Sequence, residues 1–470
     1  MRDPNAMADA PTRVAVVGAG VTGLTAAFRL QVADPSIDVV VLEASQRPGG
    51  TLRTVEVAGI PLDAGPDSFL GRKPWAMELC RELGIETARP AATGTWLWTR
   101  GGLVPYPAGT AFGIPGDLGD LFHWRGLSGR GRRRALRDLV IRKRREDGDE
   151  TLGGLLRRRL GDEATDRALA PLLSGLFGGD VDTLSADATF PELHRWERAQ
   201  GSLIRGAQAA LRDAKGGGPR PPMFVRPRDG AARLTDELAG RAGDRLRSGS
   251  RVEAIAREDD RWTLRTASGP LHADAVVLTV DPATTRRLLE PVARDVSADL
   301  AQIPVVSVGV VLVVYPEGSA EQLPSGTGFV VPRGAAPMVA CGLVSATWPE
   351  TAFGSRAIVR CTVGGAGEDD VLDADDEDIV RACTSHLAAL LPFPEEADGA
   401  SVVRWPDAVP RYLLGHLERV ARIREHLPPG IFVSGQAFDG IDVAGCVRGA
   451  TEVAEAARHF VDATRKERTA

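Results

Sequence analysis

The sequence has few of the features that mark secreted, zinc-binding or membrane-spanning proteins. Its 470 residues include only five cysteines, which are scattered, odd in number and without a CxxC pair. This pattern argues against a disulfide framework and a structural zinc site, and it favours a reducing compartment. Residues 1–12 lack the apolar core of a signal peptide, and no apolar run of about 18 residues could span a bilayer. We expect a cytoplasmic protein without a bound metal.

The net charge of the chain is also small. A value of −6 is small for a chain of this length and gives no reason to expect nucleic acid as a partner. The local exception is the basic run 125–145, which holds ten Arg or Lys residues and one acid, Asp138. Apolar residues interleave with these bases, so the run predicts either a solvated amphipathic face, which we favour, or a peripheral contact with a membrane. The sequence leaves self-association open.

The chain is long enough for two or three domains, with 43% hydrophobic and 26% charged residues, as in ordinary globular proteins. Residues 13–42 read as a βαβ unit, because two runs of β-branched residues flank a glycine-rich turn and a segment with helical spacing. Residues 224–280 and 431–460 carry further strands and helices that could join the same sheet. The intervening residues are helical and charged from 116 to 208, and rich in strands from 305 to 404.

We therefore predict the α/β class, with a doubly wound, Rossmann-like nucleotide-binding domain that is discontinuous in sequence. A mixed α+β substrate domain and a mainly helical insertion domain complete the predicted architecture. The glycine- and proline-rich stretch 215–222 supports a boundary after the helical part. The predicted ranges are 13–90, 222–304 and 405–470 for the nucleotide-binding domain, 91–115 and 305–404 for the substrate domain, and 116–221 for the helical domain.

The turn between the first predicted strand and helix is a GxGxxG motif. Gly18 permits the tight turn, Gly20 lets a pyrophosphate approach the backbone, and Gly23 allows the helix to pack closely on the strand. The N-terminus of the helix then faces the phosphates. Glu43, directly after the second strand, is placed to accept hydrogen bonds from a ribose. These features predict a dinucleotide cofactor, either NAD or FAD.

The residues that follow Glu43 favour FAD. Residues 43–51, EASQRPGGT, resemble the second flavin motif of the amine-oxidase and protoporphyrinogen-oxidase superfamily. Its twin glycines, Gly49 and Gly50, allow the backbone to pass close to a bound cofactor. Taken alone, residues 48–50 could equally form an ordinary Pro-Gly-Gly turn.

Residues 63–74, DAGPDSFLGRKP, narrow the family further. They closely resemble the GPDSFL-x-RK segment of the oxygen-dependent protoporphyrinogen and coproporphyrinogen oxidases. The resemblance extends from about residue 13 to residue 460, with departures from the family pattern at Gln436 and Gly445. Further matches follow in the family's order: VPYP at 104–107, SGLFGGD at 174–180, FPEL at 190–193, PRY at 410–412 and VSGQAFDG at 433–440.

Position by position, this resemblance implies the residues that contact FAD. Val252 would lie beside the adenine, Trp405 near the edge of the isoalloxazine, and 441–443 at the flavin ring. A helix that starts near Cys446 would aim backbone N–H groups at the part of the ring that becomes negative on reduction. The implied set is Gly18, Ala19, Gly20, Val21, Thr22, Gly23, Glu43, Ala44, Gly50, Thr51, Gly65, Pro66, Asp67, Ser68, Val252, Trp405, Gly435, Ile441, Asp442 and Val443.

The resemblance also implies an activity in haem biosynthesis. A porphyrinogen would lose six electrons to become a porphyrin, FAD would accept hydride, and dioxygen would be reduced to hydrogen peroxide. No catalytic side chain is predicted, because the cofactor carries the chemistry. The substrate is a broad disc with a carboxylate rim, so we predict that Lys73 and Arg72 bind it. We favour coproporphyrinogen III over protoporphyrinogen IX, and expect transient contacts with other enzymes of the pathway.

Three other functions are compatible with part of this evidence. A flavin amine oxidase would have the same FAD motifs, although three tyrosines make an aromatic cage for an amine less plausible. A carotenoid desaturase would be expected to show a more apolar entrance. A flavin-binding scaffold without activity would bind FAD that no porphyrinogen reduces.

Overall fold

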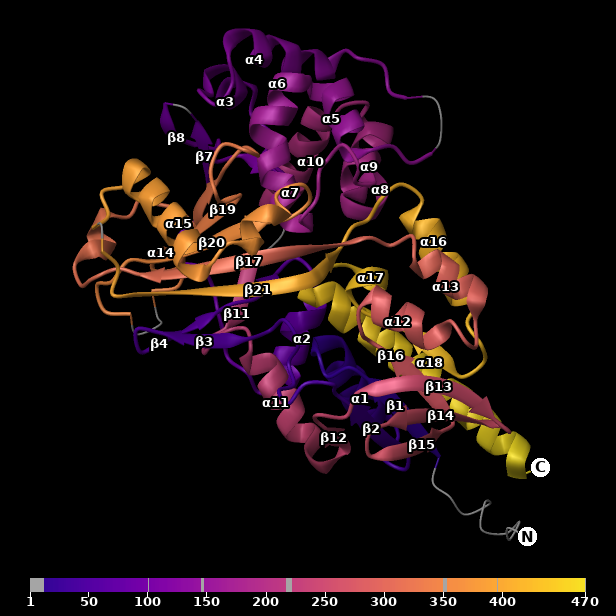
Figure 1. Cartoon of the computed structure of the whole chain (residues 1–470). Coiled ribbons are helices and arrows are strands. Elements are labelled where there is room, and N and C mark those ends of the chain that lie inside the picture. Colours follow the sequence, from indigo (N-terminus) through magenta and orange to yellow (C-terminus); the bar gives the residue numbers. More distant parts are fainter. Residues whose placement is uncertain are drawn as a thin grey trace.

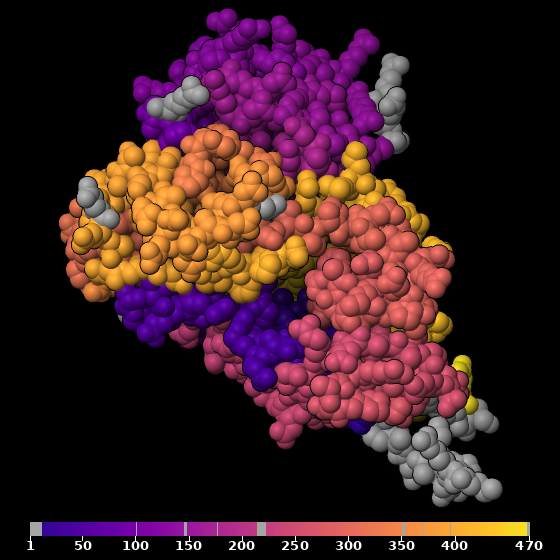
Figure 2. All heavy atoms as spheres, in the orientation of Figure 1, coloured from indigo at the N-terminus to yellow at the C-terminus, as the bar shows by residue number. Residues whose placement is uncertain are grey.

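The computed structural model describes residues 12–99, 101–144, 148–216, 222–349, 353–394 and 396–469. Most of the stretch 215–222 and the end of the basic run lie outside these ranges. The molecule has three stacked parts: helices at the top of Figure 1, a large sheet below them, and a smaller parallel sheet with its helices at the bottom. Figure 2 shows the purple helical part as a cap on the orange sheet, with the indigo N-terminal residues beneath.

The lower part is built on a five-stranded parallel sheet with the order β12-β2-β1-β16-β22. Its central strands are buried on both faces, which explains why they read as unbroken runs of β-branched residues. Distant segments supply the strands, as the sequence predicts. They are β1 (Arg13–Val17), β2 (Asp38–Leu42), β12 (Leu246–Arg247), β16 (Ala275–Leu278) and β22 (Ile431–Val433).

Each face of this sheet is covered by a different layer. Val14 and Val16 point into a core with four helices, whereas Ala15 and Val17 point toward a three-stranded antiparallel sheet. This is the layered α/β arrangement that was predicted. The helices are α1 (Val21–Ala33), α2 (Pro74–Glu82), α11 (Arg233–Ala242) and α18 (Val443–Thr469), and the strands are β13 (Val252–Glu258), β14 (Arg261–Thr266) and β15 (Gly269–Ala273).

The middle part is a seven-stranded sheet in which residues 96–105 join strands from the second half of the chain. Helix α15 (Asp376–Leu390) packs on it through Ile379, Cys383 and Leu387. Strand β21 runs across the boundary predicted at 404/405, because it stays paired with β17 as far as Pro410. The strand order is β21 (Gly399–Pro410), β17 (Val305–Val314), β20 (Ile358–Gly364), β19 (Ala340–Leu343), β18 (Gly328–Val330), β7 (Trp96–Thr99) and β8 (Gly102–Pro105).

The upper part contains the helices of residues 118–216 around their own apolar core. Its hydrophobic core includes Leu152, Leu155 and Leu156 of α5, which are fully buried. The main helices are α3 (Leu118–His123), α4 (Gly129–Leu136), α5 (Leu152–Leu160), α7 (Ala170–Phe177), α8 (Ala186–Thr189), α9 (Pro191–Gln200) and α10 (Leu203–Gly216).

Part of the basic run holds this helical part together. Arg134 donates hydrogen bonds to carbonyls of the last turn of α5, where a cation is favourable. Asp138 is fully buried and accepts a 2.5 Å hydrogen bond from the equally buried Arg159, and another from Ser202. The run is therefore more than a solvated face, although Val140 within it is exposed. Among the residues that the structure describes, no helix has the length and apolar character to cross a membrane.

Candidate functional site

The glycine loop joins β1 to α1 and needs glycine for two different reasons. Gly18 has a φ of +102°, and a Cβ on Gly23 would lie 1.9 Å from the carbonyl oxygen of Gly18. These two positions are restricted by the protein itself. A Cβ on Gly20 would meet no protein atom within 4 Å, and Gly20 precedes α1 without a side-chain cap. The backbone at Gly20 and the first N–H groups of α1 are thus open to a phosphate.

The second predicted flavin motif lies directly against this loop. The Glu43 carboxylate accepts a 2.8 Å hydrogen bond from the N–H of Ala19 and two more from Ser45. The Gly49 N–H donates to the Ala19 carbonyl at 2.8 Å, and a Cβ on Gly50 would lie 3.2 Å from the Cα of Gly20. Two motifs that are separated in sequence therefore form one continuous backbone surface.

The segment 63–66 is the third piece of this surface. A Cβ on Gly65 would lie 1.7 Å from the carbonyl oxygen of Thr51, so glycine is required there. The large sheet holds the segment from the other side. Trp405 donates its indole N–H to the Ala64 carbonyl, and Arg360 donates to the Gly65 carbonyl, each at 2.8 Å.

Asp63 anchors the same segment from below. Its carboxylate accepts hydrogen bonds from the N–H of Ala231, just before α11, and lies 3.9 Å from the buried guanidinium of Arg226. That guanidinium in turn lies over the ring of Trp348, 4.6 Å from its centroid. Burial raises the pKa of Asp63 to about 6. Neither Asp63 nor Arg226 was predicted as a site residue.

The C-terminal segment closes the surface. Gly435 has a φ of +127°, and a Cβ there would lie 3.6 Å from the Thr22 hydroxyl of α1. Asp442 directly precedes α18. One of its carboxylate oxygens accepts a hydrogen bond from the Gly445 N–H at 2.9 Å, and the other lies 2.6 Å from the Lys73 ammonium. The N-terminus of a 27-residue helix therefore faces the glycine loop and the segment 63–74.

Comparison with known proteins identifies the family. The model for flavin-containing amine oxidoreductases matches residues 21–458. The chain belongs to this family.

Within this flavin-containing amine oxidoreductase family, the chain is 30% identical over 466 residues to coproporphyrinogen III oxidase of Bacillus subtilis, a match that covers 96% of this chain and 99% of the relative. It is 31% identical over 467 residues to the protein of the same name from Mycobacterium tuberculosis, with 95% and 98% covered.

Solved structures of the family share the fold. A protein from Exiguobacterium sp. 255-15 that is assigned as a protoporphyrinogen oxidase superposes with a TM-score of 0.86 at 30% identity, covering 96% of this chain and 99% of that one. Cyclohexylamine oxidase from Brevibacterium oxydans superposes with a TM-score of 0.70 at 17% identity, covering 96% and 100%. The predicted fold class and the flavin cofactor are confirmed.

Most of the predicted flavin residues lie on segments that contact one another: the glycine loop, residues 43–51, the segment 63–66 and residues 435–443. Val252 is buried at the start of β13, on a segment tied to Glu43 through hydrogen bonds to residues 247 and 250. Arg72 is exposed and lies over the ring of Phe112, outside the cluster of flavin segments. The roles of the individual residues remain predictions.

Cys446 could be suspected of a chemical role because it lies beside the flavin segments. It is almost fully buried, and this burial raises the pKa of its thiol to about 12. A thiol in such surroundings stays protonated and is a poor nucleophile. Cys446 therefore serves packing between α18 and α1, where its thiol also contacts Thr22.

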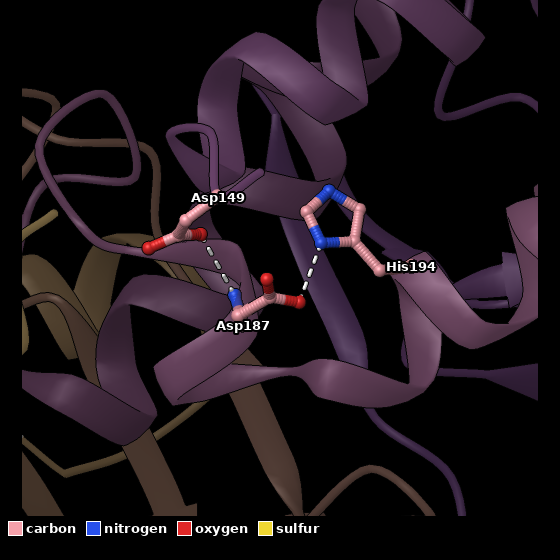
Figure 3. Close-up of side chains that lie close together, drawn as sticks. All are labelled: Asp149, Asp187 and His194. Carbon is pink, nitrogen blue, oxygen red and sulfur yellow. Dashed lines mark hydrogen bonds and ion pairs between the residues drawn. The ribbon is translucent and has the colours of Figure 1, made fainter. Parts of the chain in front are cut away.

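A second cluster of titratable groups lies in the helical part, where Asp149, Asp187 and His194 come close enough to suggest a metal site (Figure 3). Both ring nitrogens of His194 are engaged, one with Asp187 at 2.6 Å and the other with Glu150 at 3.2 Å. Asp149 accepts the backbone N–H of Asp187. The group is thus an internal ion pair that fastens α8 and α9 to the start of α5, and its imidazole has no nitrogen left for a metal.

We predict opposite effects of alanine at two glycines of the loop. Gly20→Ala should keep the free energy of unfolding of the apoprotein within about 0.5 kcal/mol but weaken FAD binding strongly, because the new methyl occupies the path of the phosphates. Gly23→Ala should destabilise the apoprotein by about 3 kcal/mol or more, because its methyl collides with a backbone carbonyl. Denaturant unfolding and FAD titration measure both. Equal loss of stability in the two variants would contradict this geometry.

We also predict a pH dependence that originates at His194. Hydrogen bonds from His194 to Glu150 and Asp187 raise its pKa above the usual value, despite the opposing effect of burial. Its contribution to stability is therefore complete below about pH 6.5, the ordinary histidine value, and is lost as pH rises through the elevated pKa. Stability should fall over that range in the natural protein and fall less in His194→Gln. His426→Gln provides the control for the loss of one histidine, since His426 is exposed and lies outside this cluster.

Proposed function

We propose that this protein oxidises coproporphyrinogen III to coproporphyrin III as a step of haem biosynthesis. The reaction removes six electrons and six protons, and three dioxygen molecules accept them to give three hydrogen peroxide molecules. The observation that carries the proposal is the GPDSFL-x-RK segment at 65–73, which lies between the glycine loop and the large sheet. Relatives that carry the name coproporphyrinogen III oxidase match almost the whole chain at about 30% identity.

Each part of the site has a task in this reaction. The open backbone at Gly20 would hold the pyrophosphate of FAD, and the Glu43 carboxylate would accept hydrogen bonds from the ribose hydroxyls. The N-terminus of α18 presents positive potential to the flavin ring, which favours the reduced form. When bound, FAD supplies the hydride acceptor and the reaction with dioxygen. The protein holds the porphyrinogen against it and excludes water.

Lys73 connects the substrate side to the flavin side. Its ammonium is held at 2.6 Å by Asp442, the residue directly before α18. Its side chain is 41% exposed, so the ammonium can also be reached by a carboxylate from outside. A substrate carboxylate that approaches Lys73 would thus dock beside the helix that faces the flavin, at the place where the reacting carbon has to be held.

Turnover of the purified flavoprotein on two porphyrinogens tests the proposal. We expect aerobic coproporphyrinogen III to give fluorescent coproporphyrin with three equivalents of hydrogen peroxide, at a higher kcat/KM than protoporphyrinogen IX. Preference for protoporphyrinogen IX would reverse the substrate assignment. Inertness toward both, with amines or carotenoid precursors oxidised instead, would replace it with one of the alternative activities. Bound FAD that no donor reduces would indicate a scaffold.

Dioxygen as oxidant is part of this proposal. Self-association, contact with a membrane surface and contacts with other enzymes of haem biosynthesis remain predictions.

We predict that Lys73→Ala raises the KM for coproporphyrinogen III about ten-fold with FAD still bound, because a charge-assisted hydrogen bond to the substrate is lost. Lys143→Ala is the matched control, since Lys143 is an exposed lysine of the helical part. Steady-state kinetics and the flavin content of each variant are measured together. An unchanged KM in Lys73→Ala would remove this residue from the substrate site.

A further inference from the structure

The tip of a small hairpin carries an aromatic residue in a backbone conformation that does not suit it. Strands β9 (Thr110–Ala111) and β10 (Ile114–Pro115) pair in antiparallel register, so Phe112 and Gly113 alone form the turn. Their φ angles are +53° and +76°. A two-residue turn with both angles positive is the type I′ turn, in which Asn-Gly is strongly preferred. Phenylalanine here is strained, and such strain tends to persist where function requires the side chain.

The surroundings of the turn fix the ring in one place. A Cβ on Gly113 would lie 2.8 Å from Leu172 and 3.2 Å from Leu169, so the hairpin rests on the helices of the cap. The ring of Phe112 packs edge-on against Phe190, with centroids 5.4 Å apart, and contacts Trp196 at 5.6 Å. The remaining face of the ring is turned to the segment 63–74.

That face lies under a guanidinium group. The Cζ atom of Arg72 is 5.2 Å from the centroid of Phe112. Arg72 is exposed, and within the described part of the chain no carboxylate pairs with it. Lys73, the next residue, has its ammonium bound by Asp442. Of the two consecutive cations, one is thus engaged by an acid and the other is oriented by an aromatic ring.

The different partners of Arg72 and Lys73 affect how each cation can bind a ligand with several carboxylates. An aromatic ring attracts a guanidinium without neutralising its charge. Arg72 is therefore held in place while its N–H groups stay available, and a receptor oriented in advance binds with less loss of side-chain entropy. A carboxylate partner would also orient Arg72, but it would offset part of the guanidinium charge, as Asp442 does for the Lys73 ammonium.

We infer that Phe112 is a positioning residue that sets the preference for carboxylate-rich porphyrinogens, by holding Arg72 as the second receptor for the substrate rim beside Lys73. The inference rests on the proposed function. Coproporphyrinogen III has four propionates and protoporphyrinogen IX has two, so a second oriented cation favours the former.

Equilibrium binding of the oxidised porphyrins tests this without turnover. Coproporphyrin III serves as the tetracarboxylate and protoporphyrin IX as the dicarboxylate, each titrated against the FAD-loaded protein. Phe112→Leu keeps an apolar side chain but removes the aromatic face. We expect it to raise the Kd for coproporphyrin III about five-fold, and the Kd for protoporphyrin IX less than two-fold, in line with the usual strength of a cation–π contact. Phe112→Tyr should retain natural binding.

Two comparisons separate positioning from packing. Phe190→Leu removes a ring from the same stack without touching Arg72, and should leave the ratio of the two Kd values unchanged. Arg72→Gln should change that ratio as much as Phe112→Leu does, and the double variant should be no weaker than Arg72→Gln alone. Equal effects of Phe112→Leu and Phe190→Leu, or additive effects in the double variant, would overturn the inference.

Failure of the proposed function is recognisable independently. Natural protein that neither oxidises a porphyrinogen nor binds either porphyrin would defeat the proposed function, and this inference with it. Porphyrinogen oxidation with an unaltered Kd ratio in Phe112→Leu defeats the inference alone. Thermal unfolding and flavin content confirm that each variant is folded, and Phe112→Tyr tests the role of the ring should Phe112→Leu prove unstable.

Discussion

The architecture depends on the close approach of backbones at the glycine loop. Gly20 lies against Gly49 and Gly50, Thr51 lies against Gly65, and Thr22 lies against Gly435. At Gly49, Gly50 and Gly65 the neighbouring atoms leave little room for a larger side chain, and Gly435 has a φ of +127° that favours glycine, whereas the space at Gly20 is open. Segments from both ends of the chain thus converge on one extended surface, and the length of an FAD molecule explains why so many separate pieces of backbone are needed.

The charges around this surface are arranged so that few of them compete with a ligand. Glu43 accepts a backbone N–H group, Asp442 accepts another and also pairs with Lys73, and Asp63 is buried at the start of the segment 63–66. Lys73 and Arg72 both reach solvent, which is consistent with a substrate that brings its own carboxylates. Further ion pairs lie in the helical cap, where Asp138, Arg159 and the His194 cluster join helices to one another.

The sequence predicts those parts of the fold and site that are encoded locally. The GxGxxG turn, the twin glycines and the β-branched strands lie within short windows, and their spacing alone requires a tight turn or a buried strand. Contacts between residues that are far apart in the chain leave no local pattern in the sequence. Arg360 reaches the Gly65 carbonyl across 295 positions, and Asp63 reaches Ala231 across 168. Phe112 was also missed, because Phe-Gly does not signal a type I′ turn. The buried Asp138 could have been noticed, since it is the one acid within a basic run.

If the proposed function is right, these segments hold FAD where a porphyrinogen can reduce it. An anaerobic titration of the purified flavoprotein with coproporphyrinogen III measures this most directly, because the visible absorbance of FAD reports its oxidation state. We expect the flavin absorbance to bleach as substrate is added and to return when air is admitted, with coproporphyrin formed. Flavin that stays oxidised beside unreacted coproporphyrinogen III would contradict it.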